Sequence, residues 1–107
     1  MALVDEHAHH IPKGTPALSE AEVTELKREI PGWIVHDKAI ERSYGFPDFA
    51  QAMEFANKIA EIAQAEDHHP DLYVSYGKVR VELSTHKIGG LSRNDFIVAA
   101  KIQQIAG

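Results

Sequence analysis

The chain changes from a helical to a strand-like hydrophobic period on either side of Pro70, and this change constrains the fold more than any other feature. From Phe49 to Ala63, apolar residues recur every three or four positions, which predicts one long amphipathic helix beginning near Pro47-Asp48. From Val79 to Thr85, apolar and polar residues alternate, which predicts a strand with one buried face. Elements that each bury one face pack on each other, so we expect helices that cover a sheet.

The long helix is expected to end near Asp67-His68-His69-Pro70, because proline disfavours the helical conformation in the residue before it. A hairpin follows, with strands at 73–76 and 79–85 and a turn at Gly77-Lys78. The helix residues expected to face the sheet are Phe49, Ala52, Met53, Ala56, Ile59, Ala60 and Ala63.

Another helix and another hairpin are predicted upstream of the long helix. Ser19-Glu20-Ala21-Glu22 has the form of a capping box, and Pro31-Gly32 stops the helix that it starts. Extended segments at 33–35 and 40–46 flank a turn at Asp37-Lys38. Two hairpins are therefore available to form one sheet.

A last helix is predicted over residues 92–106, where Ser92 and Asp95 repeat the capping pattern. Phe96 and Ile97 fall outside its main apolar stripe, so we expect a second buried face that packs against another subunit. Self-association as a homo-oligomer is the corresponding prediction, and the pattern leaves open whether this is a dimer or a tetramer. The main stripe consists of Val98, Ile102 and Ile105.

The predicted order is α-β-β-α-β-β-α, which indicates an α+β single domain: a four-stranded antiparallel sheet with helices packed on one face. The domain is expected to occupy residues 18–107. Residues 1–17 show no sustained period and contain Pro12 and Gly14, so they are predicted to be an N-terminal arm with little regular structure. We expect this arm to be mobile, with His7, His9 and His10 on it.

Composition excludes several classes of protein. The 44% hydrophobic and 25% charged fractions are typical of a globular domain. The net charge of −5 argues against direct binding to nucleic acid, and the absence of cysteine excludes disulfides and thiolate chemistry. No apolar run approaches the roughly 20 residues of a membrane span. We therefore expect a cytoplasmic protein without membrane contact.

The seven histidines are the unusual part of the composition. Two segments concentrate titratable groups. One is Asp67-His68-His69-Pro70, and the other is Ser84-Thr85-His86, with Asp95 nine residues beyond. If a strand end and a helix end bring these segments together, their imidazoles can give and take protons near neutral pH. The pattern therefore indicates a histidine acid–base site.

Each segment also has a purely structural explanation. A histidine near a helix C-terminus is favoured by the helix dipole, Asp95 can serve as a capping acid, and His86 can be an exposed residue at a strand end. A histidine metal site is a weaker alternative, because the regular spacings of zinc ligands are missing. No metal ligand is predicted.

The combination His68-His69-Pro70, Ser84-Thr85-His86 and Gly90-Leu91-Ser92 with Asp95 resembles the pterin-4a-carbinolamine dehydratase family. The resemblance covers about residues 18–107. It implies dehydration of 4a-hydroxytetrahydropterin to quinonoid dihydropterin in tetrahydropterin recycling, with no metal or organic cofactor.

The same resemblance implies the roles of individual residues. His68, His69 and His86 would be the acid–base residues. The residues that would bind or orient the pterin substrate are Asp67, Ser84, Thr85, Asp95, Gln64 and Tyr73.

The chain departs from the family pattern at two positions. Gln64 stands where an acidic residue is most common, and its amide can still form a hydrogen bond. Leu72 stands where many members have tryptophan, which removes an aromatic wall, and the sequence leaves open whether Tyr73 replaces it.

A non-catalytic role is the main alternative. Relatives in animals also act as dimerisation cofactors of a homeodomain transcription factor, so a scaffold with a transcription-factor partner would keep the fold without the activity. The complete set of three histidines favours the enzyme.

Overall fold

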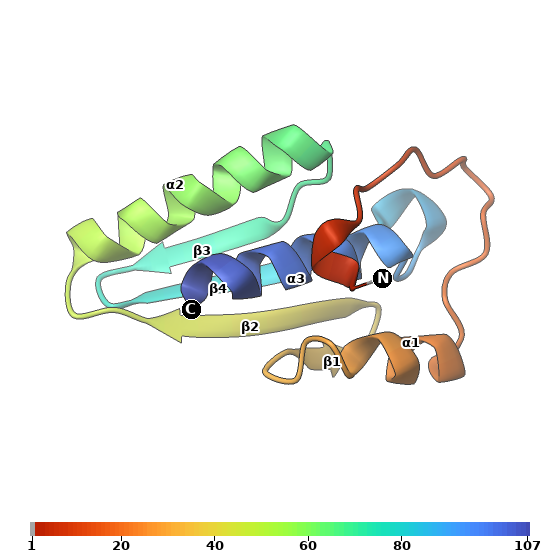
Figure 1. Ribbon diagram of the computed structural model, residues 1–107, viewed down its shortest axis with the longest axis horizontal. Helices are drawn as coiled ribbons and strands as arrows, with labels where there is room; N and C mark the ends of the chain where they lie inside the picture. The colour runs from red at the N-terminus through yellow and green to blue at the C-terminus, as the bar shows by residue number, and fades with distance from the viewer. Residues whose placement is uncertain (1) are drawn as a thin grey trace.

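The computed structural model describes residues 2–107 and has the predicted order of elements, so the predicted fold class is confirmed (Figure 1). Two short 3-10 helices are present in addition, η1 (Leu3–Asp5) and η2 (His86–Ile88). Among the described residues, no helix combines the length and apolar composition needed to cross a membrane. The main elements are α1 (Glu20–Lys27), β1 (Ile34–His36), β2 (Ala39–Gly45), α2 (Phe49–Glu66), β3 (Asp71–Ser75), β4 (Lys78–Leu83) and α3 (Arg93–Ala106).

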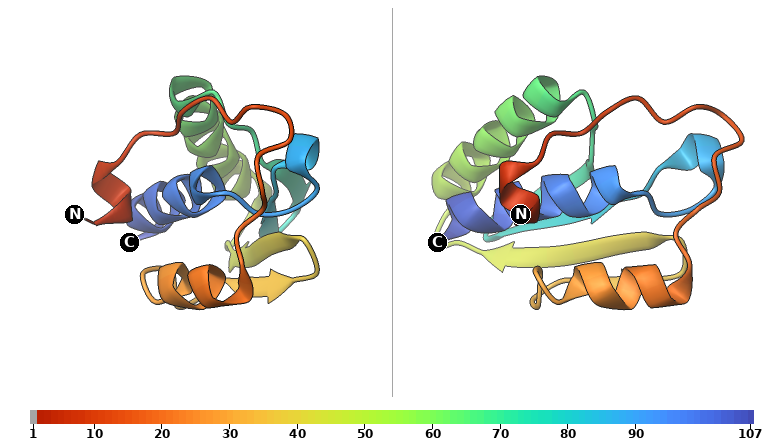
Figure 2. Two further views of the ribbon diagram at one scale, coloured as in Figure 1. Left: turned by 90° about the vertical axis from the view of Figure 1, so that its right-hand side faces the viewer. Right: turned by 45° about the vertical axis from the view of Figure 1, so that its right-hand side comes forward.

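The four strands form one antiparallel sheet in the order β1-β2-β4-β3, so the two hairpins meet along β2 and β4. The register pairs Ile40 with Leu83 and Tyr44 with Val79, and all four residues are buried. α2 and α3 lie across this face, and α1 lies beside β1 (Figures 1 and 2). The opposite face carries charged side chains such as Arg80, which approaches two glutamates. The alternation predicted for the second hairpin is therefore confirmed.

The turn of this hairpin lies at Tyr76-Gly77, one residue before the predicted position. Lys78 already pairs with Ser75 across the hairpin and with Gly45 on β2, which makes it the first residue of β4. Thr85 lies beyond the strand but stays buried, because it forms an isolated bridge with Gly90. That bridge positions Thr85 close to the start of α3.

The buried face of α2 is rotated from the predicted one. Phe49 is 48% exposed and Ala60 is exposed, whereas Phe55, which was not predicted to be buried, is only 6% exposed. The ring of Phe55 packs on Tyr44 and Phe46, with centroid distances of 4.9 and 5.1 Å. These aromatic contacts decide which side of the helix faces the sheet. The buried residues of α2 are Ala52, Phe55, Ala56, Ile59, Ala63 and Glu66.

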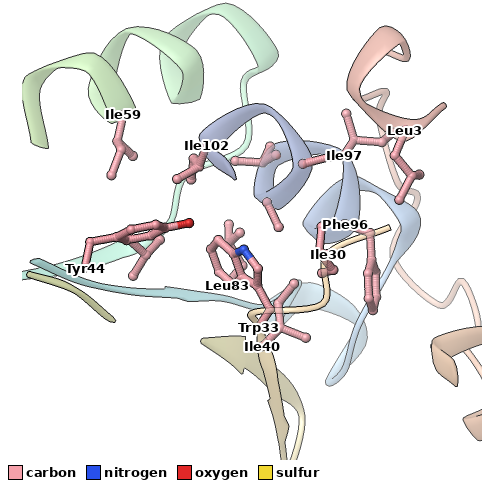
Figure 3. Close-up of a cluster of buried hydrophobic side chains, with 14 of the residues drawn as sticks. Leu3, Ile30, Trp33, Ile40, Tyr44, Ile59, Leu83, Phe96, Ile97 and Ile102 are labelled. Atoms are coloured by element: carbon pink, nitrogen blue, oxygen red, sulfur yellow. The ribbon is translucent and has the colours of Figure 1, made fainter. Parts of the chain in front are cut away.

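The prediction for α3 is wrong in one respect. Phe96 and Ile97 are fully buried within the chain, while Ile105 is 39% exposed. In the core cluster of Figure 3, Leu3 of η1 lies beside Ile97, and its own side chain is completely buried. The N-terminal arm thus covers the face that we assigned to a second subunit, so this face gives no reason to expect an interface.

The arm is packed against the domain instead of extending away from it. In the described residues before α1, η1 is the one regular element, and Leu3 and Ile11 are both buried. The Leu3 N–H donates to Glu29, and Lys101 donates to the Val4 carbonyl, at 2.9 and 2.8 Å. Burying two apolar side chains stabilises the folded chain by a few kcal/mol, which favours a docked arm over the expected mobile one.

Candidate active site

The candidate site forms where α2 ends beside the start of α3. Asp67 closes α2 in the left-handed conformation, with φ of 51°, and its N–H donates to the Ala63 carbonyl. Aspartate tolerates this conformation because its short polar side chain forms local hydrogen bonds. The helix therefore ends where Pro70 predicted, and the change of direction leaves His68 facing α3 and His69 exposed.

His68 is bound to a buried carboxylate. Its Nε2 lies 2.6 Å from Oδ1 of Asp95, with the His68 side chain 13% exposed and that of Asp95 fully buried. The second oxygen of Asp95 accepts hydrogen bonds from Thr85 Oγ1 at 2.8 Å and from the Ser92 N–H at 2.9 Å. Since Thr85 Oγ1 donates to Asp95, the Ser92 hydroxyl donates to Thr85, at 2.7 Å. Asp95 therefore caps α3 with one oxygen and holds His68 with the other.

This pair defines what His68 can do chemically. When Asp95 accepts the Nε2 proton, the imidazole is held in one tautomer and orientation, and its Nδ1 is left to accept a proton. The carboxylate then stabilises the positive charge that forms on the ring. The arrangement is that of an oriented general base.

His69 and His86 have different surroundings. His69 is exposed, and its Nε2 donates to the amide oxygen of Gln64 at 2.8 Å, so the residue that replaces the family's acidic one still contacts a histidine. His86 opens η2, is also exposed, and lies 3.3 Å from the Ser84 hydroxyl through its Nε2. Each ring has one weakly restraining contact, which leaves it accessible to a ligand.

Two small cavities border the segment from Ser84 to Gly90. One, of about 200 Å³, is lined by Asp67, His68 and Thr85 together with part of the arm. The other, of about 240 Å³, is lined by Ser84 and His86 with Glu82 and His36. The structure therefore brings His68, Thr85, Asp95 and Asp67 together and places His86 with Ser84 beside them. Within the described residues, neither cavity is lined by His69 or Gln64.

Tyr73 does not occupy the place of the missing tryptophan. Leu72 is partly buried against the core, so Tyr73 points to the opposite, open face of the sheet. There the guanidinium of Arg80 lies 3.9 Å from the centroid of the Tyr73 ring. Tyr73 could therefore form an aromatic wall only on the open face of the sheet.

A larger hollow adjoins the His86 cavity, with which it shares Asp37, Lys38, Gly89 and Gly90. It measures about 850 Å³, lies between α1 and β1, and is lined by apolar residues such as Val23, Trp33 and Ile34. Its described lining contains no histidine. Within residues 2–107, no group of three or more histidine and carboxylate side chains is arranged to hold a metal ion, and we assign no metal site.

Two residues beside the site were missed by the sequence reasoning, Glu66 and Asn94. Glu66 is buried and accepts hydrogen bonds from the Ala8 N–H at 2.7 Å and from His7 at 2.9 Å. Burial by itself would raise the pKa of Glu66, but these hydrogen bonds and the charge of Lys101 hold it below its ordinary value. The sequence did contain a signal for Glu66. It lies three residues after Ala63 and seven after Ile59, a helical spacing that places its carboxylate on the buried face of α2.

Comparison with known proteins identifies the family. Residues 16–105 match the family model described as pterin 4 alpha carbinolamine dehydratase. The chain belongs to this family. The resemblance drawn from the histidine motifs is thereby confirmed.

Individual members of the dehydratase family agree over most of the chain. A Nitrosospira multiformis protein, provisionally named pterin-4-alpha-carbinolamine dehydratase, is 49% identical over 90 residues, which cover 84% of this chain and 80% of the relative. A Xanthomonas oryzae protein of the same name is 47% identical and covers 94% of this chain and 88% of the relative, so that alignment extends into the arm. The crystal structure of a transcriptional coactivator/pterin dehydratase from Brucella melitensis has a TM-score of 0.80 and 39% identity, covering 85% of this chain and 99% of that one.

Proposed function

We propose that the protein is a lyase that dehydrates 4a-hydroxytetrahydropterin to quinonoid dihydropterin and water, in the recycling of tetrahydropterin. The observation that carries this proposal is the His68–Asp95 pair, whose histidine lines a cavity together with Asp67 and Thr85. Family membership supports a pterin as substrate. The histidine mechanism is our inference from the geometry.

The reaction needs one acid and one base. Hydroxide is a poor leaving group, so the 4a-oxygen must gain a proton as the C4a–O bond breaks. The neighbouring ring nitrogen must lose its proton, so that its electron pair can form the C4a–nitrogen double bond. The products are water and the quinonoid ring, with no net oxidation, and two imidazoles of opposite protonation supply both transfers.

His68 is the base in this proposal, because Asp95 orients its ring and balances the charge that it gains. The acid is His69 or His86, which are exposed and lightly held. A positioned acid or base contributes about 10²–10⁴-fold to the rate. Thr85 acts through Asp95, since it donates to the same carboxylate.

The remaining residues would bind the substrate. The Asp67 carboxylate lines the cavity beside His68 and can accept hydrogen bonds from the amino and N–H groups of a pterin ring. Ser84 and Gln64 hold His86 and His69, respectively. Tyr73 offers an aromatic surface on the open face of the sheet.

We infer a homo-oligomer, dimer or tetramer, acting in the cytoplasm. Apolar side chains that remain exposed, including Ile34 at 62% and Tyr76 at 71%, are available for contact with a second copy. A transcriptional co-regulator is the second candidate, because the Brucella protein of similar structure is named a transcriptional coactivator as well as a pterin dehydratase. A scaffold would not need the three histidines of the motifs.

Stopped-flow absorbance with 4a-hydroxytetrahydropterin generated in situ tests the function. The wild-type protein is expected to accelerate the decay of this compound over the buffer rate, equally with and without a chelator. Decay at the buffer rate would contradict the dehydratase and favour the scaffold. A rate that chelation abolishes and Zn²⁺ restores would contradict a mechanism carried by imidazoles alone.

A further inference from the structure

The arm is held by residues that directly adjoin the proposed catalytic pair. Asn94 precedes Asp95, and Glu66 lies two residues before His68. Both are buried, and both bind the arm's main chain. The two segments that carry the catalytic pair therefore also fix the arm's position.

Asn94 contacts both main-chain groups of one arm residue. Its Oδ1 accepts from the His9 N–H at 3.2 Å, and its Nδ2 donates to the His9 carbonyl at 2.6 Å. An amide paired in this way orients the arm as a neighbouring strand would. Arg93 donates two hydrogen bonds of 2.7 Å to the carboxylate of Glu6, which lies closer to the N-terminus of the arm.

The held segment forms one wall of the cavity beside His68. Residues 8–11 line this cavity from one side, and Asp67, His68 and Thr85 line it from the other. At about 200 Å³ the cavity is smaller than the ~300 Å³ of a typical ligand pocket, so a bound ring would touch both walls. His9 and His10, which belong to the arm wall, carry imidazoles that can donate or accept a hydrogen bond.

We propose that residues 8–11 of the arm are part of the substrate site, in which His9 and His10 bind the pterin ring and Asn94 is the residue that positions them. This inference rests on the proposed function, since the same pterin is taken as the ligand. The wall lies outside residues 16–105, which match the family model. It binds the substrate and takes no part in proton transfer.

Steady-state kinetics of dehydration test the proposal in the full chain. His9→Ala, His10→Ala and Asn94→Ala are each expected to raise KM about five- to tenfold, the effect of losing one hydrogen bond, with kcat within threefold. Lys13→Ala is the matched control, because Lys13 lies on the same arm, is exposed and does not line the cavity. Its KM is expected to equal that of the wild type.

Calorimetric binding of 7,8-dihydrobiopterin, a pterin with no hydroxyl group at C4a to lose, gives a second readout. The three variants are expected to bind it five- to tenfold more weakly than the wild type and Lys13→Ala. An active wild type whose variants keep both KM and this affinity would overturn the role of the arm and leave the dehydratase intact. A wild type that binds the pterin without dehydrating it, but loses affinity in the variants, would overturn the activity and support the arm.

Discussion

Alternate residues at the end of α2 have opposite surroundings. Glu66 and His68 face inward, where Glu66 binds the arm and His68 binds Asp95. Asp67 and His69 are exposed, and the backbone of Asp67 has the left-handed conformation that ends the helix. The inward side chains have fixed partners and orient the site, while the outward ones are accessible to a ligand. A single helix end can thus supply both a rigid base and substrate-binding groups.

Removing the inward histidine is expected to have the largest effect. His68→Ala should lower kcat by about 10³-fold, because it removes the oriented base. It should also lower the free energy of unfolding by about 1–3 kcal/mol, since buried Asp95 loses one of its partners. Stopped-flow assays and urea unfolding measure the two effects. Near-normal kcat in a folded variant would show that His68 only terminates the helix.

The exposed histidines should affect activity alone. The variant that removes the acid, His69→Ala or His86→Ala, is expected to slow dehydration by at least about 10²-fold, the scale for losing a positioned acid. Gln64→Ala and Ser84→Ala, which remove only their hydrogen-bonding neighbours, serve as controls with smaller losses. Urea midpoints should stay unchanged in all four variants. Wild-type rates in both histidine variants would leave the proposal without an acid.

Replacing Glu66, the inward-facing carboxylate, should lower the stability of the folded chain. Glu66→Ala removes the hydrogen bonds to Ala8 and His7 and is expected to lower the free energy of unfolding by about 1–3 kcal/mol. Glu61→Ala, an exposed change on the same helix, should stay within about 0.5 kcal/mol. Equal urea midpoints for the two variants would mean that the hydrogen bonds from the arm to Glu66 contribute nothing to stability.

Acid should remove part of this stabilisation. Hydrogen bonds from Arg93 hold the pKa of Glu6 below its ordinary 4.5, and the pKa of Glu66, which faces His7 and Lys101, is also lowered. A lowered pKa in the folded state stabilises the protein fully above the unfolded value and loses that contribution as the pH falls through the folded value. The stability difference between wild type and Glu66→Ala should therefore shrink below pH 4.5, as measured by urea unfolding. A difference that stays constant down to about pH 3 would contradict the cause given for the Glu66 shift.

The elements could be predicted because their signals are local. The capping box at Ser19, the stop before Pro70 and the alternation of β4 each need only a few neighbouring residues. The rotation of α2 could not be predicted, because Phe55 takes its position from Tyr44 on another element. Ile97 is covered by Leu3, which lies at the other end of the chain. The hydrophobic pattern of α3 alone cannot indicate which surface buries Ile97.

The site was predictable in its residue types but not in its pairing. The histidine motifs and the capping position of Asp95 could be recognised in the sequence, and the family resemblance assigned roles to these residues. The bond between His68 and Asp95 joins residues 27 apart, and it forms because α2 and α3 pack on the same face of the sheet. Asn94 carried no signal of its own, since its partner is the main chain of an arm without a hydrophobic period.

The most direct test of the central claim is kcat of Asp95→Asn in the stopped-flow assay. The replacement keeps the shape and an oxygen for the Ser92 N–H, but it presents an amide donor to His68 and so favours the opposite tautomer. We expect a loss in kcat of at least about 10²-fold, with the far-UV spectrum and KM nearly unchanged. A kcat within threefold of the wild type would contradict the claim that Asp95 orients His68 for the proton transfer.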